Sequence, residues 1–329
     1  MNRRDFVKGA ATATAITALA RPPAIAQAAW PARGRTIRVI VPWPPGAAND
    51  ALGRLVAQRL QDKFGAATIV ENRTGGSGLI GTKYVIDAEP DGYTFLASAF
   101  NTAVMPLVLK SADFNPETDL EVIARTGIAP LVCVMTAERP EKTVAEVVSA
   151  AKADPEKWNF AISATGSAGH LATIDFLQRT GANIPMVAYR GTQPALLDLM
   201  AGAVQLLIDT SFALIPAAKD GTKARALGIA AAKRSVLAPD IPTMAEAGVP
   251  NFEFQSWYAI WAPKGTPNEI KMTVHDLIQD TMRDPAVVKS LRTTLLEPVT
   301  ESIDQSKAFI ASEIVRARKL LQSVNFQPA

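Results

Sequence analysis

The chain has 329 residues, of which 48% are hydrophobic and 20% charged, the composition of an ordinary globular protein. Its 34 basic and 31 acidic residues give a formal net charge of +3, but the basic excess lies within the first 28 positions, and the remainder holds 30 of each sign. A neutral body gives no reason to expect nucleic acid or an anionic membrane as a partner. The single cysteine excludes an intrachain disulfide, and two histidines leave little material for a zinc site, so we expect neither cofactor nor metal.

The first 28 residues have the features of an export signal. Arg3-Arg4, followed by the weakly apolar stretch 9–20, resembles a twin-arginine signal, and Ala26-Gln27-Ala28 fits a cleavage site. The apolar stretch is too short and too polar to span a bilayer. We therefore expect a mature chain that begins near Ala29, leaves the cytoplasm by the twin-arginine route and works in the periplasm without stable membrane insertion.

The mature chain alternates short apolar runs with amphipathic stretches, a pattern typical of α/β proteins with parallel strands. In the first half, we expect strands at 37–41, 68–71 and 93–97, and helices after the first two. Asn49 or Asp50 is the expected N-cap of the first helix.

The second half repeats the pattern. We expect strands at 121–124, 131–135, 160–163, 186–189, 206–209 and 224–230. Helices are expected at 144–153, 170–180 and 193–201, with a short one from Pro242-Thr243 to Ala247. Residues 252–261 read as an extended aromatic segment, and 269–325 as mostly helical with a short strand near Val299.

Two glycine motifs allow an enzymatic interpretation. Gly76-Ser77-Gly78-Leu79-Ile80-Gly81 matches G-x-G-x-x-G, but no acidic residue ends the next strand, so we interpret it as a tight turn with close backbone approach. The segment from Thr165 through Gly166 and Ser167 is similar to the nucleophile elbow of hydrolases, with threonine where the elbow has glycine. A serine hydrolase that uses Ser167, a histidine and Asp209 stays as an alternative.

Anion binding is the other interpretation of such turns. Segments 44–50 and 165–170 each join a strand to a helix through small residues, so backbone N–H groups lack partners there and the helix dipole favours an anion. One turn in each half can hold opposite ends of a carboxylate; two well-formed turns without a ligand are the alternative. Arg190 is either a bidentate carboxylate clamp or a solvated charge. Asp209 either accepts a hydrogen bond from a ligand amine or hydroxyl, or caps a helix.

Three aromatic residues are candidates for a cleft wall, namely Trp43, Trp257 and Tyr258. Trp43 stands between two turn-forming prolines, which is a poor core position. Cys133, in an apolar strand, is expected to be an inert buried thiol. His275, in the predicted tail helix, is expected on the surface.

Many short motifs, in order along the whole mature chain, carry a family resemblance. They are Val41-Pro42-Trp43-Pro44-Pro45-Gly46 with Asp50 and Arg54, Val70-Glu71-Asn72-Arg73, residues 75–81, Pro90-Asp91-Gly92-Tyr93-Thr94, Gly166-Ser167 with His170-Leu171, Tyr189-Arg190-Gly191, Arg225-Ala226-Leu227, Pro242-Thr243, Trp257, and residues 262–267. The chain resembles the periplasmic receptors of tripartite tricarboxylate transporters, known as Bug proteins.

The resemblance implies a two-lobed α/β fold of the periplasmic-binding-protein type, with each lobe a twisted sheet flanked by helices and two crossover strands joining the lobes. We place the crossings near 121–129 and 252–261, the first lobe at 29–124 plus 255–329, and the second at 125–254. It also implies a monomeric, non-enzymatic receptor that delivers a small carboxylate to membrane transporter subunits; a receptor that reports its ligand to a sensor kinase is an alternative.

In this family, backbone amides and ordered water in two loops hold the anion, which places the loops at 44–49 and 165–167, with His170 beside the second. Family members often have Gly-Gly where this chain has Gly46-Ala47, so we expect a differently shaped first loop. The expected ligand-binding residues are Trp43, Pro45, Gly46, Ala47, Ala48, Asn49, Ser98, Asn101, Thr165, Gly166, Ser167, His170, Arg190 and Asp209.

Overall fold

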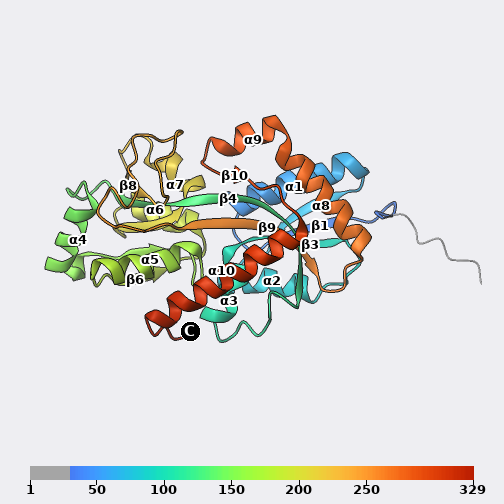
Figure 1. Cartoon of the computed structure of the whole chain (residues 1–329), viewed down its shortest axis with the longest axis horizontal. Helices are drawn as coiled ribbons and strands as arrows, with labels where there is room; N and C mark the ends of the chain where they lie inside the picture. Colours follow the sequence, from blue (N-terminus) through green and yellow to red (C-terminus); the bar gives the residue numbers. More distant parts are fainter. Residues whose placement is uncertain (1–29) are drawn as a thin grey trace, which may run out of the picture.

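The computed structural model describes residues 30–329, so the predicted export signal at 1–28 lies outside the described residues. The described part has two α/β lobes arranged along the long axis of the molecule (Figure 1). None of its helices is both long enough and apolar enough to cross a membrane.

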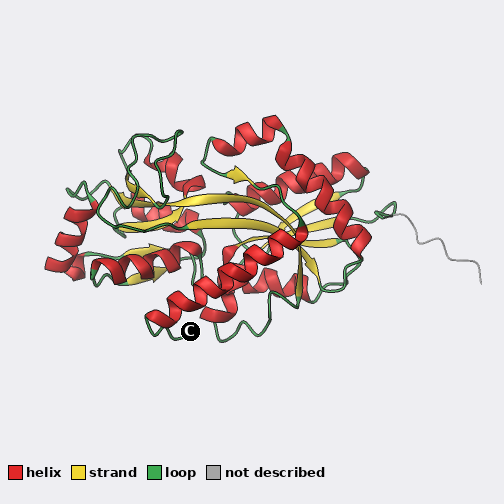
Figure 2. Cartoon of the chain, in the orientation of Figure 1, coloured by secondary structure: helices red, strands yellow, loops and turns green. Residues whose placement is uncertain are grey.

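Two antiparallel strands, β4 (Leu120–Thr136) and β9 (Gln255–Pro263), run along that axis and connect the lobes (Figure 2). β4 pairs with β9 up to Pro130 and with strands of the second lobe from Leu131 onward. A strand of 17 residues extends about 56 Å at roughly 3.3 Å per residue, so β4 can serve both lobes. The prediction of two separate strands at 121–124 and 131–135 was wrong, because Gly127 and Pro130 interrupt the apolar pattern of one continuous strand.

The first lobe contains a mixed sheet in which β1, β2 and β3 are parallel and β9 is antiparallel to β3. Its strands are β1 (Ile37–Val41), β2 (Thr68–Asn72), β3 (Thr94–Ala99), β9 and β10 (Glu297–Pro298). Its helices are α1 (Ala48–Phe64), α2 (Leu79–Ile86), α3 (Phe100–Val108), α8 (Asn268–Arg283), α9 (Pro285–Arg292) and α10 (Ile303–Ser323), with a 3₁₀ turn at Gly76–Gly78.

The second lobe has the same plan around the far end of β4. Its strands are β5 (Phe160–Ile162), β6 (Met186–Ala188), β7 (Leu206–Thr210) and β8 (Ala224–Ile229). Its helices are α4 (Val144–Ala153), α5 (Ala168–Thr180), α6 (Thr192–Met200) and α7 (Ser211–Ala218), with a 3₁₀ turn at Pro155–Lys157. The strand order through both lobes is β2-β1-β3-β9-β4-β7-β5-β6, with β8 and β10 also paired to β4.

The helices α3 and α7 were not predicted, and one predicted helix is absent from the described residues. α3 and α7 each contain an internal proline, Pro106 and Pro216, which normally argues against a helix interior. The expected short helix ending at Ala247 is a series of turns. Its start resembles a helix cap because Thr243 and Glu246 exchange the hydrogen bonds of a capping box, but no helix follows.

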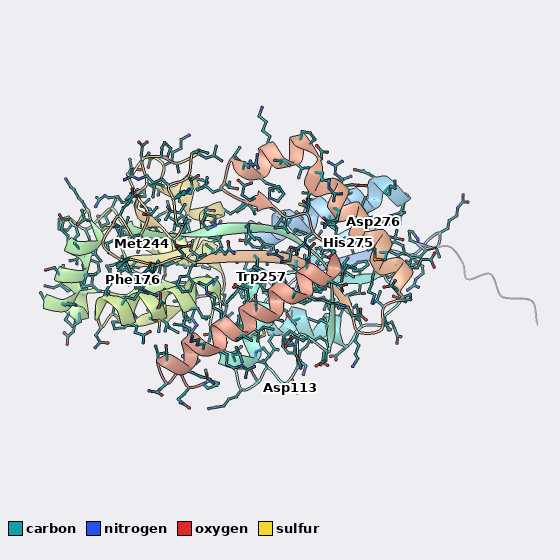
Figure 3. All side chains as sticks on the ribbon, in the orientation of Figure 1. Asp113, Phe176, Met244, Trp257, His275 and Asp276 are labelled. Atoms are coloured by element: carbon teal, nitrogen blue, oxygen red, sulfur yellow. The ribbon has the colours of Figure 1, made fainter. Side chains whose placement is uncertain are left out.

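Two predicted surface or cleft positions are in the core (Figure 3). Trp257 is fully buried and packs edge-to-face on Phe100, with ring centroids 6.1 Å apart, so it is not a cleft wall. His275 is buried on the inner side of α8, where its Nδ1 lies 2.8 Å from the carbonyl oxygen of Ile123, so the prediction of a surface histidine was wrong. Cys133 is buried as predicted, and burial raises its pKa to about 12.

Candidate functional site

A cavity of ≈ 70 Å³ lies between the two lobes and is called the interlobe cavity below. The first lobe lines it with Trp43, Pro44, Ala47, Ala48, Asn49, Ala99, Phe100 and Asn101, together with Ser256 and Tyr258 from the connecting strand β9. The second lobe lines it with Ser163, Ser167, Ala168, Gly191, Thr192, Gln193, Asp209 and Thr210.

Five helices begin at the interlobe cavity. Each follows the carboxyl end of a strand: α1 follows β1, α3 follows β3, α5 follows β5, α6 follows β6 and α7 follows β7. Ligands of open α/β sheets bind outside the carboxyl ends of strands, where helix amino ends collect. Each amino end carries unpartnered N–H groups and a partial positive charge, so this arrangement favours an anion.

The interlobe cavity favours an anion although no basic side chain lines it. Among the lining residues, Asp209 is the single one with a charged side chain. In the described part of the chain, the amides of Ala48, Asn49, Ala168 and Gly169, at the starts of α1 and α5, donate no hydrogen bond. Main-chain groups on both lobes are therefore available as donors for an anion.

The first loop is shaped by Asp50. Its carboxylate accepts hydrogen bonds from the Gly46 amide (3.1 Å), Arg54 Nε (3.0 Å) and Asn72 Nδ2 (2.9 Å). Burial acts to raise the pKa of Asp50, but these hydrogen bonds together hold it below its usual value. Asp50 therefore ties the loop to α1 and β2 and does not line the interlobe cavity.

The N-cap of α1 is Ala47, not Asn49 or Asp50 as predicted. Ala47 has extended backbone angles (φ −83°), whereas the left-handed conformation falls on Gly46 (φ +94°). An alanine in place of the family's second glycine is thus accommodated without strain. Because alanine has no side chain that can cap a helix, the first-turn amides of α1 stay free.

The second loop is fixed by His170. Gly166 N–H donates to His170 Nδ1 (3.0 Å), and Ser167 Oγ accepts from the backbone N–H of His170 (3.0 Å). Burial lowers the pKa of His170 to about 4, so the ring is neutral at pH 7. Ser167 therefore caps α5, and within residues 30–329 no hydrogen bond joins its Oγ to the imidazole of His170.

Asp209 is the acceptor at the second-lobe side of the cavity. Its carboxylate accepts from the Thr210 amide (2.7 Å) and from Thr192 Oγ1 (2.9 Å), and no cation forms an ion pair with it among the described residues. Burial is the largest influence and raises the pKa of Asp209, against the opposing effect of these hydrogen bonds and of Ser163 nearby.

The sequence-predicted residues divide into two groups. Trp43, Ala47, Ala48, Asn49, Asn101, Ser167 and Asp209 line the interlobe cavity. Pro45, Gly46, Ser98, Thr165, Gly166, His170 and Arg190 lie outside its lining. Arg190 is exposed, the position expected of a solvated charge, whereas Gly46, Gly166 and His170 shape the two loops.

Several lining residues were missed, notably Phe100, Ser163, Thr192 and Ser256. Phe100 and Thr210 stand where β3 and β7 run directly into helices, so no glycine-rich turn marked them. The signal that could have found them is the repeated strand-to-helix order itself. The motif at 76–81 lies beside the cavity; a Cβ on Gly78 would come within 3.1 Å of Trp43, which confirms the interpretation as a close backbone approach.

The fold and this site have clear relatives. A family model described as the tripartite tricarboxylate transporter family receptor matches residues 52–326. The chain belongs to this family. Protein BugT of Bordetella pertussis is 37% identical to this chain over 284 residues, and the match covers 86% of this chain and 87% of BugT.

Two solved structures share the two-lobed fold. Rpa4515 of R. palustris, solved with adipate, has a TM-score of 0.87 and 34% identity, covering 91% of this chain and all of that chain. The periplasmic binding protein BugD has a TM-score of 0.84 and 26% identity, covering 90% and 99%. The fold is therefore that of a periplasmic binding protein.

Proposed function

We propose that this receptor captures a small organic carboxylate in the interlobe cavity, without transforming it, and delivers it to the membrane subunits of a tripartite tricarboxylate transporter. It does so in the periplasm as a monomer, after export by the twin-arginine route. The observation that carries the proposal is the meeting of five helix amino ends at a cavity without a basic side chain. The adipate bound by Rpa4515 supports the ligand class.

Closure of the lobes couples capture to delivery. The first lobe is taken as 29–124 plus 255–329 and the second as 125–254, with β4 and the segment before β9 as the hinge. Amides of Ala48 and Asn49 on one lobe and of Ala168 and Gly169 on the other grip the same anion. A ligand that contacts both lobes stabilises the closed form, because only differential affinity shifts such an equilibrium.

Isothermal titration against mono-, di- and tricarboxylates tests this proposal. Asn49→Asp places a negative charge in the first turn of α1, which helix electrostatics favour in the free protein, yet it repels a bound carboxylate. We expect a 10- to 100-fold loss of affinity, about 1.4 to 2.7 kcal/mol. Arg190→Gln, outside the cavity, is the matched control and should bind as tightly as the wild type. The proposal fails if no carboxylate binds, or if the protein turns one over.

A further inference from the structure

Tyr258 carries an unsatisfied hydroxyl inside the interlobe cavity. The residue is 4% exposed, lies on β9 and lines the cavity. Its Oη lies near the side chains of Thr210, Ser256 and Asp209, but none of these contacts has the geometry of a hydrogen bond. A buried hydroxyl without a partner costs free energy, and Tyr258 is one of the residues that line the cavity, so a bound ligand can supply the missing partner.

A second orphan group lies on the first lobe. Asn49, 4% exposed, starts the first turn of α1, and its side-chain Nδ2 also lacks a partner. This amide can only donate, so it complements the free main-chain amides beside it and suits a ligand carboxylate. The carboxylate end of the ligand is thereby assigned to the Asn49 side of the cavity.

At the Tyr258 side, the neighbouring charge is negative. Asp209 is 4% exposed and lacks a cationic partner in the described structure, and its charge acts on the Tyr258 hydroxyl. A ligand hydroxyl or ammonium can donate to Asp209 while meeting the oxygen of Tyr258. A second ligand carboxylate would accept from Tyr258 but would lie against the Asp209 carboxylate, which like-charge repulsion opposes.

We propose that Tyr258 and Asp209 form a specificity subsite for a hydrogen-bond donor, a hydroxyl or an ammonium, carried by a short carboxylate. This inference rests on the proposed function, because it assigns the second end of the same ligand. The cavity is small, at ≈ 70 Å³, so the test begins with acids of three and four carbons.

Isothermal titration with two matched series tests the subsite. The first is propionate, 3-hydroxypropionate, β-alanine and malonate; the second is butyrate, 4-hydroxybutyrate, 4-aminobutyrate and succinate. We expect the hydroxyl or the amino member to bind at least tenfold tighter than both the unsubstituted acid and the dicarboxylate. The difference in affinity between the hydroxyl-substituted and the amino-substituted acid shows which donor the subsite prefers.

Tyr258→Phe is the decisive variant. It removes only the hydroxyl, so the donor preference should fall at least tenfold, while the melting temperature of the free protein rises by about 2 °C because a buried orphan group is gone. Thr82→Val is the control: it removes another buried orphan hydroxyl, on α2 and outside the cavity, and should leave the preference unchanged. Asp209→Asn should shift preference toward the dicarboxylate.

The outcomes separate the two proposals. Equal or tighter binding of the dicarboxylates by the wild type, or an equal effect of Tyr258→Phe on every ligand, overturns the subsite and leaves carboxylate capture standing. Binding of no carboxylate of any length, adipate included, overturns capture and the subsite together.

Discussion

The helices on the first-lobe face of the interlobe cavity begin after alanines, whereas the second-lobe face carries one capping serine and one acidic side chain. Ala47 and Ala99 precede α1 and α3 and leave their first-turn amides uncapped. On the other side, Ser167 caps α5, and Asp209 accepts hydrogen bonds from Thr210 and Thr192. One face thus offers donors, and the other combines donors with a fixed acceptor. Both lobes can therefore grip an anion, while Asp209, the charged acceptor that can distinguish one anion from another, lies on the second lobe.

The two faces also differ in how tightly helix and strand pack. A Cβ on Gly169 of α5 would stand 2.1 Å from the carbonyl oxygen of Ile208, a backbone atom that cannot move aside alone. We expect Gly169→Ala to destabilise the protein by about 3 kcal/mol, although alanine ordinarily favours a helix. Gly53→Ala in α1 meets only side-chain methyl groups at 3.0 and 3.1 Å and should change stability within about 1 kcal/mol. Urea unfolding measures both; equal losses would contradict the difference.

The second-lobe loop has a pH dependence between about pH 6.5 and pH 5, where Asp50 of the first loop, whose pKa is held below its usual value, does not titrate. The pKa of His170 is lowered from 6.5 to about 4 by burial, so protons bind the unfolded chain more readily than the folded one. Stability is therefore complete above about pH 6.5 and is lost as the pH falls toward 4. We expect a loss of about 2 kcal/mol between about pH 6.5 and pH 5.

The control for this loss is His170→Gln, whose amide oxygen can still accept from Gly166. Over the same pH interval, this variant should lose much less stability than the wild type in urea unfolding experiments. A wild-type loss that the substitution leaves unchanged would assign the pH dependence to other groups.

The smallest expected effect concerns the uncapped start of α1. Ala47→Ser supplies a hydroxyl that can accept from a first-turn amide, because Ala47 already has the extended angles of an N-cap. The free protein should gain about 1 kcal/mol. The same hydroxyl competes with a ligand for those amides, so carboxylate affinity should fall severalfold. A gain in both stability and affinity would show that these amides are not the ligand's donors.

Much of the fold was predictable because its strands and helices obey the α/β pattern, as 37–41 and 144–153 show. The helices α3 and α7 could not be predicted, because each has a proline in its interior, where a helical sequence pattern normally has none. The two loops that reach the cavity could be predicted, because small residues mark each strand-to-helix turn. Tyr258 and its neighbour Trp257 were both candidates for the cleft wall, and only Tyr258 lines the cavity. The sequence could not choose between them, since which face of a strand meets the cavity depends on how the lobes are placed.

The central claim is that main-chain amides of both lobes hold the carboxylate. An NMR titration of ¹⁵N-labelled protein with a bound carboxylate tests it most directly. The account predicts that the largest amide shifts fall on Ala48 and Asn49 in α1 and on Ala168 and Gly169 in α5. Shifts confined to one lobe, or centred on Arg190, would contradict it.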